Sequence, residues 1–230
     1  MKRPMPLLVF LVAGVFLGSG ASLIYLKSRT KSPPAAPIVQ QPESDALSGL
    51  TIPPFSLIDH HGEPFTHENL KGRVTVLDFF FIHCPTICPI KTAKLAALTE
   101  TLADTGVRFV SVSVDPKHDR PEQLRAYAKM HEADLIRWSF LTGDEQTVTS
   151  IVADGLKFVM EQDKTTSVTL ESGEVIHNIL HPSWFVLLGP DGGQSGIKGL
   201  YRSSSDEDIR RLANDARALD RQLRSQTSRP

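Results

Sequence analysis

Residues 74–89 read VTVLDFFFIHCPTICP, and this stretch decides the fold. Its first part, Val74–Ile82, is almost entirely apolar, β-branched or aromatic, which is typical of a strand buried on both faces of a sheet. A helical pattern of Ala and Leu among Lys and Thr follows over Ile90–Leu102. Cys84 and Cys88 therefore lie at a strand-to-helix turn, the place where open α/β sheets build their sites.

Predicted strands and helices alternate on either side of this stretch. A first hairpin covers residues 55–66 and turns at Gly62. Further strands are predicted over residues 107–114, 138–141, 184–188 and 197–201, and helices over 121–130, 145–153 and from the capping pattern of Ser205 and Asp208 onward. Residues 158–180 are predicted to form a hairpin or an excursion. This order indicates one α/β domain over residues 55–225, with a mixed sheet flanked by helices.

The N-terminal segment, residues 1–31, is predicted to be a membrane anchor. Its residues 6–26 are nearly all apolar, and as a helix they would span roughly 30 Å, which matches a bilayer core. A cleaved signal peptide ending near Ser19-Gly20-Ala21 is the alternative. Residues 32–54 contain six prolines and few large apolar side chains, so they are predicted to be an extended linker.

Composition excludes several classes of protein. A net charge of −1 argues against a strongly basic nucleic-acid binder, so no nucleic-acid partner is expected. Two cysteines cannot build a disulfide-dense scaffold or a four-cysteine metal site. They can form one disulfide, one two-thiolate metal site or one redox pair. The start of a helix should lower a thiol pKa there, which would prepare either chemistry. Two buried structural cysteines are the plainer alternative.

Other short motifs extend the pattern beyond the cysteines. They are Phe55…Leu57…Asp59…Gly62, Leu70-Lys71-Gly72, Ser113-Val114-Asp115-Pro116 with Asp119 and Pro121, Phe140-Leu141-Thr142-Gly143, His181-x-Ser183 and Pro190-Asp191-Gly192. With Cys84-Pro85-Thr86-Ile87-Cys88-Pro89, this series resembles the Sco (SenC/PrrC) family of copper-binding, thioredoxin-like assembly proteins for cytochrome c oxidase. The resemblance covers about residues 55–202.

The resemblance implies a copper site made of Cys84, Cys88 and His181. Copper(I) is a soft ion that prefers thiolate and accepts imidazole, and two thiolates make either Cu⁺ or Cu²⁺ plausible. The implied function is that of a membrane-tethered metallochaperone, which needs no catalytic turnover, rather than an enzyme. Its expected partners are the copper-centre subunit of cytochrome c oxidase and an upstream copper donor or thiol reductant. The expected location is the inner membrane, with one N-terminal span and the domain in the periplasm.

Other functions remain open at this point. A thiol–disulfide oxidoreductase or redox sensor would need only Cys84 and Cys88. A peroxidase-like relative ranks last, because the cysteine loop contains no arginine beside a reactive thiol. Zinc would also be accepted by thiolate and imidazole ligands.

Four further residues are candidates for lesser roles. His177 is a second choice for the nitrogen ligand. His83 departs from the family pattern next to the first cysteine, and we expect it to be a polar surface residue. Asp115 is expected either to lie close to the cysteines or to start a helix with Pro116. Asp78, inside the apolar strand, is expected to point outward or to be hydrogen-bonded.

Overall fold

The computed structural model describes residues 47–85, 87–170 and 172–227. The predicted anchor, residues 1–31, lies outside the described residues, and so does the predicted linker as far as residue 46. Within the described ranges, no helix is both long enough and apolar enough to cross a bilayer.

The described end of the predicted linker packs against the domain. Ile52 is only 1% exposed, and its N–H donates to the Gly193 carbonyl at 3.0 Å. Leu50 is buried as well. The folded domain therefore begins before Phe55, because two apolar side chains that precede the prolines at 53 and 54 belong to its core.

One seven-stranded mixed sheet forms the centre of the domain, with strand order β2-β1-β5-β4-β3-β8-β9. The strands are β1 (Ser56–Asp59), β2 (Pro64–Thr66), β3 (Thr75–Phe80), β4 (Arg108–Ser113), β5 (Trp138–Thr142), β8 (Trp184–Leu188) and β9 (Ile197–Arg202). β3, β4 and β5 run parallel, whereas β8 is antiparallel to β3. All six residues of β3 are buried, so the strand predicted to be covered on both faces is confirmed.

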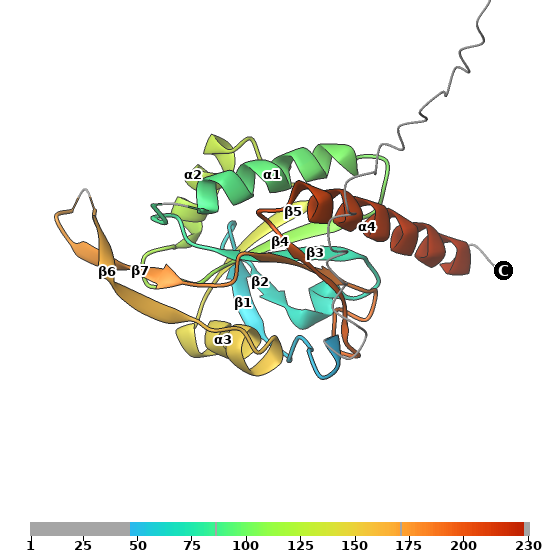
Figure 1. The fold of residues 1–230 in the computed structure, drawn as a ribbon, viewed down its shortest axis with the longest axis horizontal. Coiled ribbons are helices and arrows are strands. Elements are labelled where there is room, and N and C mark those ends of the chain that lie inside the picture. The colour runs from blue at the N-terminus through green and yellow to red at the C-terminus, as the bar shows by residue number, and fades with distance from the viewer. Residues whose placement is uncertain (1–46, 86, 171, 228–230) are drawn as a thin grey trace, which may run out of the picture. The chain divides into compact units, whose positions relative to one another are not determined.

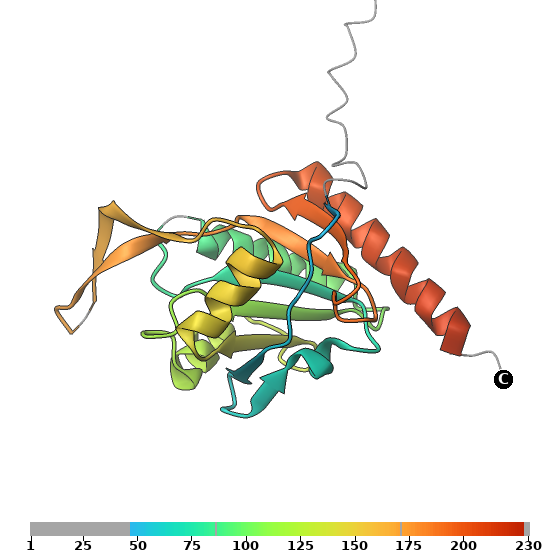
Figure 2. The same cartoon turned by 90° about the horizontal axis from the view of Figure 1, so that it is seen from below.

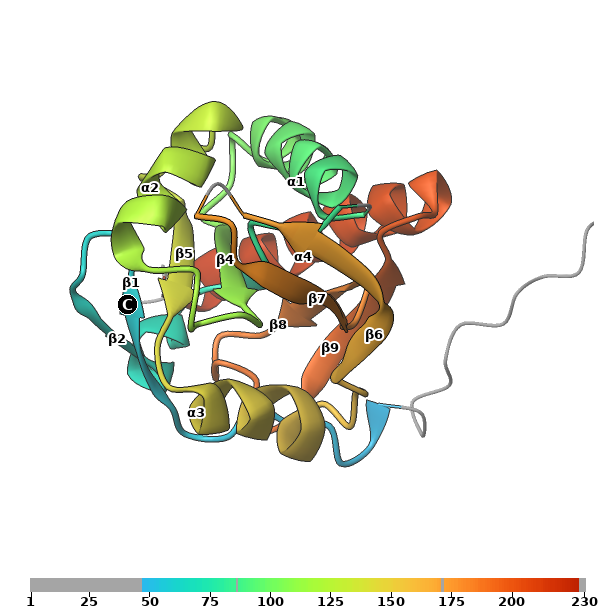
Figure 3. The same cartoon turned by 90° about the vertical axis from the view of Figure 1, so that its left-hand side faces the viewer.

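Helices cover both faces of this sheet. They are α1 (Cys88–Thr101), α2 (Pro121–Met130), α3 (Glu145–Thr149), α4 (Asp206–Thr227) and the short 3₁₀ helix η2 (His67–Leu70). α1 and α3 lie on opposite faces, as Figures 2 and 3 show. The predicted mixed α/β architecture is thus confirmed.

Two helix boundaries differ from prediction. α1 begins at Cys88 rather than Ile90, because Pro89 fits the first turn of a helix, where its missing N–H is not needed. The helix predicted over residues 145–153 is α-helical only to Thr149 and continues as a π-helical segment, η3 (Ser150–Gly155).

A separate hairpin accounts for the segment predicted as a hairpin or excursion. β6 (Glu161–Thr169) and β7 (Val175–Leu180) pair antiparallel and form their own two-stranded sheet. The hairpin projects away from the main sheet (Figures 1 and 2). Its last residue, Leu180, directly precedes His181.

Candidate metal centre

The turn between β3 and α1 places both cysteines at the carboxyl end of the central strand. The N–H of Cys84 donates to the Phe81 carbonyl at 3.3 Å, and Cys88 is the first residue of α1. Cys84 is 6% exposed and Cys88 is fully buried, and no disulfide joins them. The strand-to-helix location predicted for the pair is confirmed.

His181 contacts this turn although it follows Cys88 by 93 positions in the sequence. It lies between β7 and β8, and its Nε2 is 3.3 Å from the Sγ of Cys88. Its ring meets the ring of Phe81 edge-on at 5.7 Å between centroids. Its Nδ1 is 3.2 Å from the Pro182 carbonyl oxygen, which can only accept. Nδ1 therefore carries the proton, and the lone pair of Nε2 faces the sulfurs.

The three side chains form a compact set of potential ligands. One ligand atom from each of Cys84, Cys88 and His181 lies within 4.8 Å of the other two. Within residues 47–85, 87–170 and 172–227, no other group of three His, Cys, Asp or Glu side chains meets that criterion. Two sulfurs and one imidazole nitrogen suit copper(I), whereas a structural zinc site would normally need a fourth protein ligand.

The two thiols resist losing both protons. The pKa of Cys88 is raised well above its usual range, first by its hydrogen bond with Cys84 and then by burial. The nearby Lys91 ammonium acts in the opposite direction but is the smaller influence. The lowered thiol pKa expected from the helix start is therefore wrong for Cys88, because two adjacent buried sulfurs cannot both carry charge without a cation between them.

Lys91, which no sequence motif singled out, lies one turn along α1 from Cys88. This lysine is 1% exposed, and its Nζ donates to the Phe79 carbonyl at 2.8 Å and to the Pro182 carbonyl at 3.2 Å. Its Nζ also lies 3.6 Å from the carboxylate of Asp78. Helical spacing from Cys88 to Leu95 places Lys91 on the buried face, and that spacing was a signal that could have found it.

Asp78 was expected either to point outward or to be hydrogen-bonded, and it is buried and hydrogen-bonded. The Ser111 hydroxyl donates to its Oδ1, and the Trp138 indole N–H donates to that hydroxyl oxygen at 2.9 Å. A polar chain thus runs from β5 through β4 and β3 to Lys91.

Asp119 supports the cysteine turn from the neighbouring loop. This fully buried carboxylate accepts the N–H of Ile82 at 3.1 Å and the hydroxyl of Ser113 at 2.6 Å. Burial raises its pKa to about 7. Its other oxygen, Oδ1, has no hydrogen-bond partner among the described residues.

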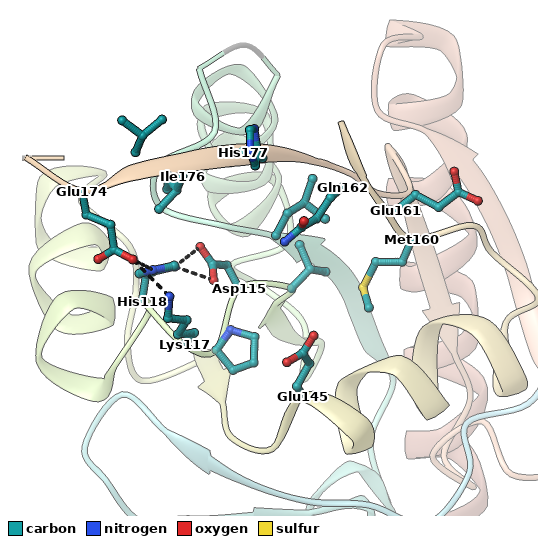
Figure 4. Close-up of a pocket in the computed structure, with 14 residues that line it drawn as sticks. Asp115, Lys117, His118, Glu145, Met160, Glu161, Gln162, Glu174, Ile176 and His177 are labelled. Carbon is teal, nitrogen blue, oxygen red and sulfur yellow. Dashed lines mark hydrogen bonds and ion pairs between the residues drawn. The ribbon is translucent and has the colours of Figure 1, made fainter. Parts of the chain in front are cut away.

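Asp115 belongs to a different cluster, between the loop after β4 and the β6–β7 hairpin. His118 lies between two carboxylates, with Nδ1 2.8 Å from Asp115 and Nε2 3.4 Å from Glu174, as Figure 4 shows. Lys117 also pairs with Glu174 at 3.0 Å. These groups line a pocket of about 250 Å³. The expectation that Asp115 starts a helix is wrong, since its carbonyl begins a turn and α2 starts later, at Pro121.

The two alternative histidines lie outside the set of three ligands. His177 is exposed on β7, while its neighbour Ile176 is buried and faces the pocket (Figure 4). This is the alternation expected of a strand. His83, which was expected to be a polar surface residue, is partly exposed in the cysteine turn.

Comparisons with known proteins agree with this geometry. The sequence matches the protein family described as SCO1/SenC over residues 44–217. The SCO1 protein homolog of Bacillus subtilis is 36% identical over 143 residues, which are 61% of this chain and 69% of that protein.

Two solved structures share the fold. The structure of BsSco, described as a member of the Sco family of cytochrome c oxidase assembly proteins with a disulfide switch, has a TM-score of 0.60 at 29% identity. The alignment covers 76% of this chain and 95% of the BsSco chain. The copper-bound ScoI of Arabidopsis thaliana has a TM-score of 0.59 at 26% identity and covers 72% of this chain and 98% of its own.

Proposed function

Because this chain belongs to the SCO1/SenC family, we propose that it is a membrane-tethered copper metallochaperone that helps to assemble the dinuclear copper centre of cytochrome c oxidase. The observation that carries the proposal is the meeting of Cys84, Cys88 and His181 across the fold. Copper is bound in the related Arabidopsis ScoI structure, and BsSco is described as belonging to a family of oxidase assembly proteins.

The arrangement of ligands suits a carrier. Two thiolates with Cu⁺ give the site a net charge of −1, and with Cu²⁺ the site is neutral. The hydrogen bond with Cys84, followed by burial, raises the pKa of the Cys88 thiol well above its usual range, so a metal ion must displace its proton. Copper binding therefore expels protons, and protons or a partner's own thiolates can displace the copper again.

The proposed setting is the inner membrane, with residues 6–26 as a single span and the domain in the periplasm. This segment lies outside the described residues, so the support for it is the apolar sequence alone. The partners proposed there are the copper-centre subunit of the oxidase and an upstream copper donor or thiol reductant. Membrane fractionation and protease protection, with and without residues 1–31, test this placement.

The direct test of copper binding uses the full chain, purified in mild detergent, reduced and loaded with Cu(I) without oxygen. A graded chelator then competes for the metal. We expect one tightly held copper, which Cys84→Ser abolishes and His181→Ala weakens at least about tenfold. His177→Ala is the matched control and should leave the affinity unchanged. A chain that retains no copper would refute the proposal.

The role in assembly is tested in cells that lack their own protein of this family. Wild-type chain should restore the absorbance of the dinuclear copper centre in the oxidase, and Cys88→Ser should not. Restoration by a variant that cannot bind copper would refute copper delivery as the function.

The closeness of the two reduced sulfurs favours a second candidate, a thiol–disulfide oxidoreductase. One thiolate would attack a partner's disulfide, and the other would release the partner as two thiols, leaving Cys84 and Cys88 joined. That reaction does not use His181. Two results together would favour this candidate. The wild-type chain would bind no copper, and the His181→Ala variant would reduce a disulfide substrate at the wild-type rate.

A further inference from the structure

The feature behind this inference is a buried ammonium beneath the nitrogen ligand. Lys91 reaches from α1 into the space between β3 and the turn after β7, where its Nζ contacts the carbonyl oxygens of Phe79 and Pro182. It also lies over the ring of Phe185, 5.6 Å from the centroid. A lysine this deeply buried is rare in proteins unless it is paired, and here Asp78 is the pairing group.

The Pro182 carbonyl has two contacts that connect Lys91 to the site. It accepts from the Lys91 ammonium at 3.2 Å and from Nδ1 of His181 at 3.2 Å. A carbonyl oxygen has two lone pairs, so it can accept both. Because the proton is on Nδ1, the lone pair of Nε2 is available to bind a metal ion. Nε2 lies 3.3 Å from the Sγ of Cys88.

The same ammonium also contacts two residues of the central sheet. Phe79 and Asp78 belong to β3, and the Asp78 carboxylate is itself held by Ser111 of β4. The position of the Pro182 carbonyl is therefore tied to the most buried strands of the domain. The hairpin that precedes His181 forms a separate sheet and offers no such anchor through its own strand pairing.

We propose that Lys91 is a positioning residue, which fixes the Pro182 carbonyl and thereby holds the His181 imidazole with Nε2 aimed at Cys84 and Cys88. Groups that hold the distal nitrogen of a metal-binding histidine commonly change metal affinity by about 10–100-fold when they are removed. The inference rests on the proposed copper site and deepens it.

The test replaces the ion pair as a unit. Removing Lys91 alone would leave Asp78 as an unpaired buried charge, whereas exchanging both partners for neutral side chains of similar volume is usually tolerated. The variant is therefore Asp78→Asn with Lys91→Met in the full chain, since asparagine can still accept from Ser111. If this pair does not fold, Asp78→Leu with Lys91→Met takes its place.

A second lysine on α1 provides the matched control. Lys94 contacts the Ser203 carbonyl and Asp206, on the side of the helix that faces α4. Lys94→Met makes the same chemical change on the same helix without touching the turn of Pro182. Its copper affinity should stay within about twofold of wild type.

The decisive comparison measures Cu(I) affinity in two backgrounds, with His181 present and with His181→Ala. With His181 present, the paired replacement should lower the affinity about 10–100-fold. With His181→Ala, the same replacement should change it less than about threefold, because the residue that Lys91 positions is already gone. The inference would be overturned if the paired replacement lowered the Cu(I) affinity by factors that agree within threefold in the two backgrounds. It would also be overturned if the affinity fell in neither background. Equal losses would show that the ammonium acts through its charge on the thiolates.

A spectroscopic readout separates positioning from stability. The Cu(II) form of the wild-type chain should show nitrogen hyperfine coupling in its electron paramagnetic resonance spectrum, and the paired variant should lose it at full copper occupancy. Retained coupling would overturn the inference. A wild-type chain that binds no copper, or a His181→Ala variant with wild-type affinity, would instead refute the proposed site itself.

Discussion

The carboxylate of Asp119 accepts the backbone N–H of Ile82, 37 residues earlier in the chain, at 3.1 Å. Ile82 lies two residues before Cys84, so this hydrogen bond connects the loop after β4 to the start of the cysteine turn. The Ser113 hydroxyl, at the end of β4, donates to the same oxygen. The position of the first sulfur thus depends on a buried acid that is not itself a ligand candidate.

This acid should make stability depend on pH. The pKa of Asp119 is raised from 3.8 to about 7 in the folded chain, so between these values the folded state holds a proton that the unfolded state has lost. The free energy of unfolding should therefore fall as pH rises from 4 to 7, by up to about 4 kcal/mol. Asp119→Asn should flatten this fall in denaturant titrations at pH 4.5 and 7.5. The exposed Asp154→Asn is the control, and an equal slope in wild type and Asp119→Asn would contradict the prediction.

Copper affinity should rise with pH. Since the pKa of Cys88 is raised by its neighbouring thiol and by burial, its proton must leave when copper binds. Each proton displaced makes the apparent Cu(I) affinity increase about tenfold per pH unit. Chelator competition between pH 6 and 8 measures the slope, corrected for the chelator's own protonation. A pH-independent wild-type affinity would contradict the prediction, because it would show that the thiols ionise beforehand.

Phe81 should support the nitrogen ligand in addition to the core. Phe81→Leu and Phe109→Leu both remove a buried ring, so each should cost about 1–3 kcal/mol in the free energy of unfolding. Phe81 also contacts the imidazole of His181 edge-on. An aromatic contact of this kind corresponds to about a twofold to tenfold change in copper affinity. Only Phe81→Leu should show that change, and equal affinities in both variants would rule out the supporting role.

The contacts of Glu174 should hold the β6–β7 hairpin against the loop after β4. Glu174 pairs with Lys117 and His118, both of which belong to that loop. Glu174→Gln should speed amide hydrogen exchange in β6 and β7 about twofold to fivefold, as expected for an exposed ion pair, without changing exchange in β3. Glu161→Gln makes the same charge change on β6 and should have a smaller effect. Unaltered exchange in the Glu174 variant would mean that strand pairing alone holds the hairpin.

Much of the fold was predictable because local patterns and tertiary burial agree. The run from Val74 to Ile82 could only be a buried strand, and the alternation that follows specifies the mixed sheet. The π-helical turn after Thr149 was not predictable, because the spacing of apolar residues there suits either kind of helix. Leu50 and Ile52 were assigned to the linker because prolines dominate the local composition, although two apolar side chains suffice to fix the segment on the core.

The site was predictable in unequal parts. The two cysteines lie close together in the sequence, and the sixteen residues from 74 to 89 are enough to predict the turn that holds them. His181 became a candidate mainly through family resemblance, since its approach to Cys88 depends on the whole sheet. Lys91 and Asp119 were missed as supports, because charged residues are usually exposed and nothing local reveals which ones are buried with partners.

His181 follows Cys88 by 93 positions in the chain, and this separation affects the order of events during synthesis. At about 5–20 residues per second, ribosomal synthesis takes roughly 5–20 s to add this length of chain. During that interval the nascent polypeptide carries both thiols but lacks the imidazole. Copper met early would be held by sulfur alone, and an oxidant would meet an unprotected dithiol. Metal loading is therefore expected to follow completion of the chain, and a supply of reducing equivalents matters most for newly made molecules.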